Sequence, residues 1–274
     1  MKRHQIQAKL KNYGDVHAML SAMKSVALVE LKKLGGQLER QHQTLETVEA
    51  AAADLLAFFP LPIETGHQVR IVIGSERGFC GDFNESLLPC TITNDQNQHS
   101  LIVIGSGLTE HLPEQTTCYR LPGPSILEEI PAIIEGLSNL LAEIQRAQTE
   151  KPLRISVLHH VQHGIIEKLI SPISSTPKQA TSAPLYHSAP ALTLPPEELL
   201  AGLMKQSILL SLQEIFTQSL SAENYQRVAH MENALNHLDE LNQKLLREMN
   251  RARQENIIQE IETILLNSDT LPSE

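Results

Sequence analysis

The first sixty residues repeat apolar side chains at alternating spacings of four and three positions, and this repeat constrains the fold more than any other feature. Thirteen of its sixteen positions are apolar. A seam this narrow is typical of an α-helix packed along a single partner helix. With a rise of about 1.5 Å per residue the helix would be about 80 Å long, so most of it would project from a compact domain of this size. The sixteen positions are Ile6, Leu10, Tyr13, His17, Leu20, Lys24, Ala27, Leu31, Leu34, Leu38, Gln41, Leu45, Val48, Ala52, Leu55 and Phe59.

The last fifty residues supply a second seam that can be the partner. Residues 1–40 contain eight Lys/Arg against three Asp/Glu, whereas residues 221–274 contain five against ten. Opposite net charges favour pairing of the two ends of the chain, although each exposed ion pair is weak. The alternative is a dimer in which each helix packs against its own copy. The C-terminal seam consists of Val228, Met231, Leu235, Leu238, Asn242, Leu245, Met249 and Ala252, followed after a one-residue slip by Ile257, Ile261 and Ile264.

Between the two seams, short β-branched runs alternate with a helical pattern. Strands separated by helical stretches are typical of a Rossmann-like α/β domain with a mostly parallel sheet. The predicted fold class is therefore α/β with long helices, in which the N- and C-terminal helices form an antiparallel two-helix coiled coil around an inserted α/β domain. Strands are predicted over residues 69–73, 101–104 and 154–158, and a helix over residues 125–149.

Prolines mark the inner ends of the two long helices. Pro60 and Pro62 stop the first helix, and the run Pro195-Pro196-Glu197-Glu198 predicts the start of the second, which continues to about residue 266. The intervening stretch 171–196 is too rich in proline for a helix and predicts an extended connector. We predict three parts: a coiled-coil helix over 1–60, an α/β domain over 61–196 that includes the connector, and a C-terminal helix over 197–274.

Composition excludes several classes of function. The formal net charge is −10, and the acidic excess lies in residues 41–220, so nucleic acid is not the expected ligand. Cys80, Cys90 and Cys118 lack paired metal-ligand spacing and indicate reduced thiols in a cytosolic-type compartment. No uncharged apolar run approaches the length of a membrane span, so we expect contact with a membrane only through other subunits.

The glycine-rich loop after the first predicted strand is the stretch most similar to a binding site. Gly74, Gly78 and Gly81 follow that strand, where doubly wound folds bind phosphates. The spacing is not G-x-G-x-x-G, and no Lys-Ser/Thr follows as a P-loop requires. Gly105-Ser106-Gly107 likewise lacks a third glycine. Tight turns beside the sheet are therefore favoured over a dinucleotide site, and no cofactor is predicted.

Two further groups suggest chemistry but have plainer interpretations. His159, His160 and His163 lie at a strand end without the Cys or carboxylate partners that a metal site needs, so no metal is predicted. Cys80 follows Arg77, which could lower the pKa of a reactive thiol, but a small buried residue in a tight loop is the favoured interpretation. No catalytic site is predicted.

A methionine-rich segment adds a second apolar stripe to the first helix. Residues 19–27 are apolar on more than one face. Because a two-helix rod buries only one face of each helix, the second stripe indicates either an enclosing partner or packing against the chain's own α/β domain.

Three blocks of the sequence, in order and with matching spacing, resemble the gamma subunit of F-type ATP synthases, the central stalk that turns inside a ring of alpha and beta subunits. Ala22-Met23-Lys24-Ser25-Val26-Ala27 is similar to the family's Ala-Met-x-Met-Val-Ala, with Ser25 in place of Met. Residues 75–84 are similar to its S-D-R-G-L-C-G-x-F-N. Residues 223–231 and 250–264 are similar to its two C-terminal blocks, and the resemblance covers essentially the whole chain.

The resemblance implies a non-catalytic rotor that couples ion flow, of hydrogen ions or sodium ions, to ATP synthesis or hydrolysis at the alpha and beta subunits. The implied partners are the alpha and beta subunits, the epsilon subunit and the c-ring, at the cytoplasmic face of a bacterial inner membrane. The residues that it places in contact with the ring are Met23, Lys24, Arg227, Met231, Arg253, Gln254 and Glu260. The family's signature loop corresponds to Ser75, Arg77, Gly78, Cys80, Gly81 and Asn84. Packing in the seam or plain solvation is the alternative for each contact residue.

The sequence also departs from the family's pattern. Ile258 stands where threonine is usual, Gly105-Ser106-Gly107 lacks the usual lysine, and residues 267–272 differ from the usual small-residue tail. These departures indicate a divergent branch. Two alternative functions stay open at this point: a nucleotide- or metabolite-binding α/β enzyme that dimerises through its coiled coil, and a free-standing coiled-coil scaffold.

Overall fold

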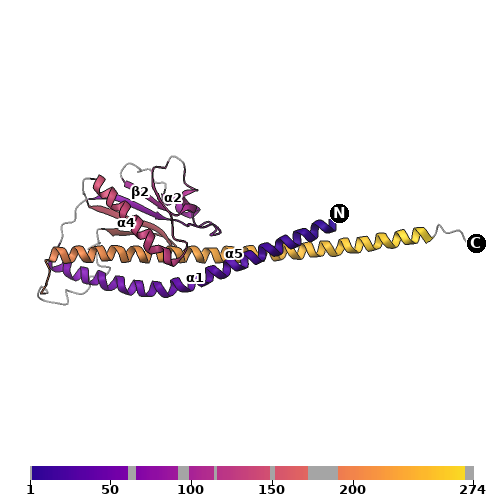
Figure 1. The fold of residues 1–274 in the computed structure, drawn as a ribbon, viewed down its shortest axis with the longest axis horizontal. Coiled ribbons are helices and arrows are strands. Elements are labelled where there is room, and N and C mark those ends of the chain that lie inside the picture. The colour runs from indigo at the N-terminus through magenta and orange to yellow at the C-terminus, as the bar shows by residue number, and fades with distance from the viewer. Residues whose placement is uncertain are drawn as a thin grey trace, which may run out of the picture. The chain divides into compact units, whose positions relative to one another are not determined.

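A computed structural model describes residues 2–60, 66–91, 99–113, 116–148, 152–171 and 191–268. The chain forms two compact units, Met1–Val26 with Val228–Glu274, and Ala27–Arg227. Two long helices, α1 (Lys2–Phe58) and α5 (Pro196–Ser268), contribute to both units. Within each unit α1 lies along α5, as Figure 1 shows, which confirms the predicted pairing of the chain ends. The predicted division at residues 60 and 196 stays a prediction.

Ion pairs fix the direction of the two helices in the unit that contains the chain ends. Lys24 Nζ lies 3.2 Å from Glu232 Oε1, and His17 Nε2 lies 3.6 Å from Asp239 Oδ1. Higher numbers on α1 therefore meet lower numbers on α5, so the helices are antiparallel. The same register sets Lys2, where α1 begins, level with Gln254.

The predicted seam matches the buried face of α1. All sixteen of its positions are buried or half-buried, among them Leu20, Leu34 and Leu45. On α5 the positions from Val228 to Ala252 are also covered. Because α5 of the same chain already covers the seam, the alternative of pairing between two copies is wrong for these residues. The predicted continuation through Ile257 and Ile261 is also wrong, since both are exposed where α1 has ended, and Ile264 lies outside the residues whose side chains the structure describes.

The unit Ala27–Arg227 contains a five-stranded sheet in the order β3-β2-β1-β4-β5. All neighbouring strands are parallel except β4 and β5, which form an antiparallel hairpin. The three predicted strands are confirmed, whereas β3 and β5 were not predicted. The strands are β1 (His67–Ile73), β2 (His99–Ile104), β3 (Tyr119–Leu121), β4 (Leu153–Val161) and β5 (Gly164–Ser171).

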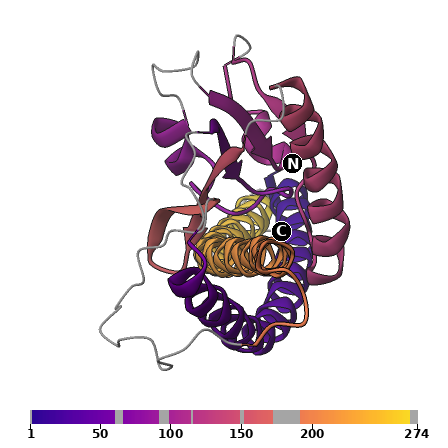
Figure 2. The same ribbon diagram turned by 90° about the vertical axis from the view of Figure 1, so that its left-hand side faces the viewer.

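Helices cover both faces of this sheet, and Figure 2 shows α4 and α5 against one of them. On one face, Ile71 and Ile73 of β1 pack with α4 (Ile130–Ala147), with Phe216 of α5 and with Leu34 of α1. The predicted helix over 125–149 is thereby confirmed, preceded by the short turn η2 (Leu127–Glu129). The other face is covered by η1 (Glu85–Leu87), α2 (Leu88–Thr91) and α3 (Ser106–Thr109). The predicted connector lies mostly outside the described residues.

Polar contacts fasten α1 to the start of α4. The backbone N–H of Leu127 donates to Glu30 Oε1 over 2.8 Å, and Glu30 is itself buried. Lys33 Nζ lies 3.1 Å from Glu128 Oε1 and 3.6 Å from Glu30 Oε2. The long helix and the sheet-covering helix are therefore held together by hydrogen bonds as well as by apolar packing.

We expect Leu34→Ala to lower the free energy of unfolding by about 2–5 kcal/mol, because it removes a fully buried side chain from the main core. Urea unfolding of the full chain, followed by circular dichroism, measures the change. Val29→Ala on the same helix is the matched control: Val29 is 60% exposed, so its change should stay within about 0.5 kcal/mol. Equal losses in the two variants would contradict the packing described above.

Candidate functional site

The signature loop after β1 is closed by a pair of hydrogen bonds. The backbone N–H of Ser75 donates to Asn84 Oδ1 over 2.9 Å, and Asn84 Nδ2 donates to Ser75 Oγ over 2.8 Å. Both residues are buried. The ends of the loop are therefore pinned together, and the residues between them form a rigid projection from the sheet.

Arg227 of α5 holds this loop from the other side. Its guanidinium group donates to the carbonyl oxygens of Gly78 and Arg77 over 3.3 and 3.5 Å, and to Asn224 Oδ1 over 3.0 Å. It also forms an ion pair with Glu223, one helical turn away. Arg227 is buried, so its guanidinium group acts inside the molecule, where it joins α5 to the loop.

The ion pair stands in a low-dielectric environment. Burial raises the pKa of Glu223 to about 7, while the Arg227 guanidinium opposes this rise by favouring the ionised carboxylate. The pair is therefore sensitive to the loss of either member, because a charge left behind would be buried without a partner.

The middle of the loop points one side chain outward and the next inward. Phe79 has a positive φ of 63° and its side chain is 54% exposed, which is unusual for a large apolar residue. Cys80 turns inward and packs with Phe83 and Ala222. Burial raises the pKa of the Cys80 thiol, so the interpretation as a small buried residue is confirmed and that of an activated thiol is wrong.

Glu76, in the loop after β1, joins the loops that follow β2 and β3. Its carboxylate accepts hydrogen bonds from the N–H of Gly123 (2.7 Å) and from the N–H and hydroxyl of Ser106 (2.9 and 2.8 Å). Burial alone would raise the pKa of Glu76, but these donors outweigh it and lower the pKa. The donors that a phosphate group would use in such a fold are thus occupied by the chain's own carboxylate.

The histidines of the predicted strand end do not share one site. His159 Nε2 lies 3.2 Å from Gln218 Oε1 of α5, whereas His160 stacks on Phe83 and places Nε2 2.9 Å from its carbonyl oxygen. Burial lowers the pKa of both histidines. Because successive strand residues point to opposite faces, His159 and His160 cannot bind the same ion. His163 lies in the exposed turn between β4 and β5.

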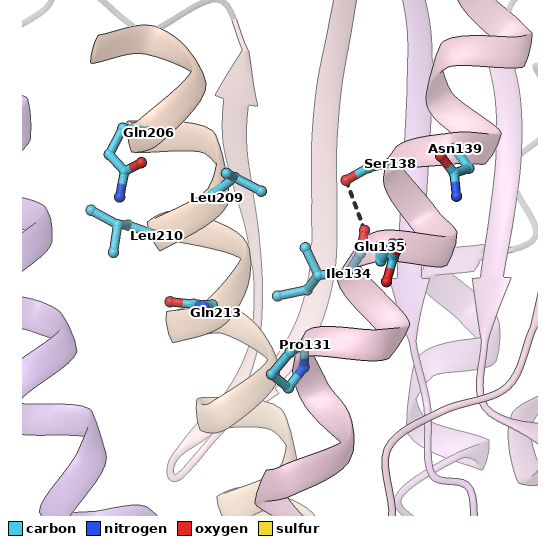
Figure 3. A pocket seen from close by; sticks show the side chains of 9 residues that line it. All are labelled: Pro131, Ile134, Glu135, Ser138, Asn139, Gln206, Leu209, Leu210 and Gln213. Atoms are coloured by element: carbon cyan, nitrogen blue, oxygen red, sulfur yellow. Dashed lines mark hydrogen bonds between the residues drawn. The ribbon is translucent and has the colours of Figure 1, made fainter. Parts of the chain in front are cut away.

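One cavity, of about 350 Å³, lies between α4 and α5 (Figure 3). Its floor is apolar and its rim consists mostly of amides, with Glu135 as the one ionisable side chain of the lining. The Ser138 hydroxyl donates to the carbonyl oxygen of Ile134 over 2.7 Å, so no base activates it. The lining therefore holds no nucleophile with a base. It consists of Pro131, Ile134, Glu135, Ser138, Asn139, Gln206, Leu209, Leu210 and Gln213.

The predicted ring-contact residues fall into two groups. Met231 is fully buried in the seam, and Lys24 pairs with Glu232 across it. Arg253, Gln254 and Glu260 are exposed on α5, and Met23 is half-exposed on α1. Together with the buried Arg227, these residues do not form one cluster, and their contact with a ring stays a prediction.

An apolar stripe on α1 stays exposed in the folded chain. Met19 and Val26 are 63% and 65% exposed, Val16 is 43% exposed, and the half-exposed Met23 lies on the same face. Each of the four lies one position before a residue of the seam. Val16 was not recognised from the sequence, although this offset is the signal that identifies it. An exposed apolar stripe indicates a surface that a partner covers.

Helix α5 contains one 18-residue window whose length and mean hydropathy of 1.2 would allow it to cross a membrane. The helix is also part of the main core, where Leu212, Ile215 and Phe216 are buried against the sheet. Its apolar character is therefore explained by packing inside the protein.

Comparison with known proteins gives consistent results along the whole chain. The family described as "ATP synthase" matches residues 2–270. The ATP synthase gamma chain of Rickettsia felis is 24% identical over 97% of this chain and 98% of its own length. The rotor of the Euglena gracilis mitochondrial ATP synthase matches with a TM-score of 0.63 at 15% identity, over 93% of this chain and 99% of its own. A chain of the OSCP/F1/c-ring part of that enzyme matches with a TM-score of 0.67 at 14% identity, over 100% and 97%.

We expect Arg227→Gln to lower the free energy of unfolding by about 3–5 kcal/mol, because Glu223 would be left as a buried charge without a partner. Without the guanidinium the pKa of Glu223 should rise further. A carboxyl group whose pKa is raised on folding stabilises most below its unfolded pKa of about 4.5, so the variant should lose stability as the pH rises toward and past about 7. Urea unfolding of the full chain at several pH values measures both effects.

Arg253→Gln is the matched control, because Arg253 is exposed and its loss should change stability by no more than about 0.5 kcal/mol. The double variant Glu223→Gln/Arg227→Gln should recover part of the loss, since no buried charge remains. If Arg227→Gln unfolds like the control at every pH, Arg227 does not hold the loop.

Proposed function

Because this chain belongs to the ATP synthase gamma-chain family, as its non-catalytic central-stalk rotor subunit, we propose that the exposed stripe of α1 and the unpaired end of α5 are the surfaces that meet the ring of alpha and beta subunits. The rotor couples ion translocation to ATP synthesis or hydrolysis that takes place on other subunits. In this proposal, the residues on these two surfaces transmit the coupling.

The exposed stripe of α1 is the observation that carries the proposal. Met19 and Val26 are more than 60% exposed although they are apolar and lie on a well-formed helix. Met23, which stands at the methionine of the motif that residues 22–27 resemble, lies on the same face, and we propose that this face meets the ring. A sleeve of other subunits around α1 would cover the stripe and remove this apolar surface from water.

The end of α5 offers a second apolar surface. Ile257, Ile258 and Ile261 are about half exposed and lie beyond the start of α1 in the antiparallel register. The exposed polar residues of this end, Arg253 and Gln254, would make directional hydrogen bonds with the ring. Ile258 replaces the family's usual threonine, so a purely apolar contact takes the place of a hydroxyl there.

Arg227 and Met231 would act from inside the molecule. Both are buried, so we propose that they set the shape of α5 and of the signature loop, while Lys24 acts through its pair with Glu232. Arg77 and Phe79 have exposed side chains in that loop, and we propose that they contact the ring.

A rotor of this kind acts by biasing conformations. The stripe covers one side of α1 only, so each orientation presents a different surface to ring sites that are otherwise equivalent. A site changes conformation only by as much as the rotor's contact free energy differs between its states. Unequal surfaces around the shaft are therefore the physical source of the coupling.

The α/β unit is the part of the chain that we propose contacts the remaining partners. We propose that the epsilon subunit and the c-ring lie against the α/β unit, and that the whole assembly lies at the cytoplasmic face of a bacterial inner membrane. The gamma chain of Rickettsia felis supports a bacterial setting, and the match to a chain of a c-ring-containing assembly is consistent with the partners. Polar joints at Glu30, Lys33 and Arg227 would keep the α/β unit from slipping against its helices.

The α/β enzyme hypothesis rested on a possible phosphate site in the loops that follow the central strands. Glu76 occupies the donors of Ser106 and Gly123 that a nucleotide phosphate would need. Family membership replaces both this hypothesis and the free-standing scaffold.

Met23→Lys tests the proposal in vesicles that carry the reconstituted ATP synthase. A charge on an enclosed apolar face has no partner, so we expect ion transport per ATP hydrolysed to fall at least about tenfold, which corresponds to about 1.4 kcal/mol. Ion pumping and ATP hydrolysis are measured on the same vesicles, and circular dichroism of the full chain checks that the fold is kept.

Ile166→Lys is the matched control, because Ile166 is an exposed apolar residue of the α/β unit, 41% exposed, and the same charge is added there. Coupling should fall less than in Met23→Lys, because the added charge lies away from the stripe. Normal coupling in both Met23→Lys and Met19→Lys would contradict the assignment of the stripe as a ring contact. Equal losses in Ile166→Lys would show that the effect is not specific to the stripe.

A further inference from the structure

His42 of α1 lies between two carboxylates. Its Nδ1 is 2.9 Å from Glu214 Oε1 of α5, and its Nε2 is 3.2 Å from Glu46 Oε1, one turn further along α1. A carboxylate accepts hydrogen bonds and, when ionised, has none to donate. An imidazolium cation, with a proton on each ring nitrogen, can donate to Glu214 and also face Glu46, so this geometry favours the charged ring.

Glu214 is the buried centre of the arrangement. Its side chain is 5% exposed, and its other oxygen, Oε2, lies 3.1 Å from Lys168 Nζ of β5. Burial would raise the pKa of Glu214, but Lys168 and His42 outweigh it and lower the pKa, so the group stays ionised. One carboxylate thus ties α5 to two other elements, to β5 through Lys168 and to α1 through His42.

Of the two ties, the one to α1 contains an imidazole. The tie to β5 is made by Lys168 Nζ. The hydrogen bond from His42 to Glu214 raises the pKa of His42, and the carboxylates of Glu214, Glu46 and Glu39 add to the rise against a smaller opposing effect of burial.

The remaining titratable group at this junction is His159 of β4. Burial lowers its pKa, and its Nε2 lies against Gln218 and not against Glu214. Among the described residues, His42 is thus the histidine that contacts the Glu214 carboxylate.

From this geometry we propose that His42 is a proton-operated clasp between the two long helices, strongest when the imidazole is doubly protonated and weakened when it loses one proton. Deprotonation removes the positive charge from the contact with Glu214 and so loosens α1 at this turn, while Lys168 still contacts Glu214 from β5. The clasp is a property of this chain alone and stands or falls independently of the proposed contacts with the ring.

The sign of the effect follows from the raised pKa. A histidine with a higher pKa in the folded chain contributes its full stabilisation below its unfolded pKa of about 6.5, and that stabilisation is lost as the pH rises through the folded value. Acidification toward about pH 6 therefore tightens the junction, and alkaline pH loosens it.

Histidine resonances of the full chain, recorded by NMR between about pH 5.5 and 8.5, test the clasp directly. One resonance should titrate above about 6.5 and vanish in His42→Gln. In Glu214→Gln the same resonance should move to lower pH, because the main partner of the cation is gone. Urea unfolding across the same range should show several-fold less change in the unfolding equilibrium constant for His42→Gln than for the unmodified chain.

His17→Gln is the matched control, because His17 also faces a carboxylate across the helix pair, Asp239 at 3.6 Å, but touches no second acid within 4 Å. This variant should keep the His42 resonance and the pH dependence of the unmodified chain. Lys168→Gln should keep the titration of His42 at or above its original pH while lowering stability at every pH. A His42 resonance that titrates at or below the ordinary value, or one that Glu214→Gln leaves unmoved, would overturn the proposal.

Discussion

Burial of one apolar seam between α1 and α5 is the interaction on which the rest of the structure depends. Neither helix could remain folded alone over its length, because isolated helices in water are stabilised mainly by what they pack against. The sheet is inserted between the two helices in sequence and uses them as one of its walls, since Leu34 of α1 and Phe216 of α5 complete its main core. Pairing of the chain ends therefore makes the frame into which the strands fold.

The seam also contains polar residues, and they cost stability in order to fix the arrangement. The side-chain oxygens of Gln41 and Asn242 are buried with no hydrogen-bond partner among the described residues. A polar residue in an otherwise apolar seam disfavours registers in which it would meet a worse environment. Glu30 and Glu214 are buried too, but each has donors on a neighbouring element, so they tie specific turns of the helices to the sheet unit.

The sequence predicted those features that repeat with a short period. The helix seam follows from spacings of four and three, and the central strands follow from β-branched runs bounded by glycine. β3 was missed because three residues carry no periodicity, and β5 because its charged residues Glu167 and Lys168 interrupt the apolar run. The grip of Arg227 on Gly78 spans 149 residues of sequence, and no local pattern can indicate such a contact. Motif resemblance identified these residues as important, but only the structure shows that Arg227 points inward.

The carboxylate of Glu76 has a consequence for the loops at the carboxyl ends of the central strands. In doubly wound α/β folds, ligands with phosphate groups bind at this end of the parallel strands. Here the Glu76 carboxylate, which is part of the chain itself, occupies the hydrogen-bond donors at this place. At Ser106 and Gly123 the chain's own carboxylate therefore accepts the hydrogen bonds that a bound phosphate group would otherwise accept.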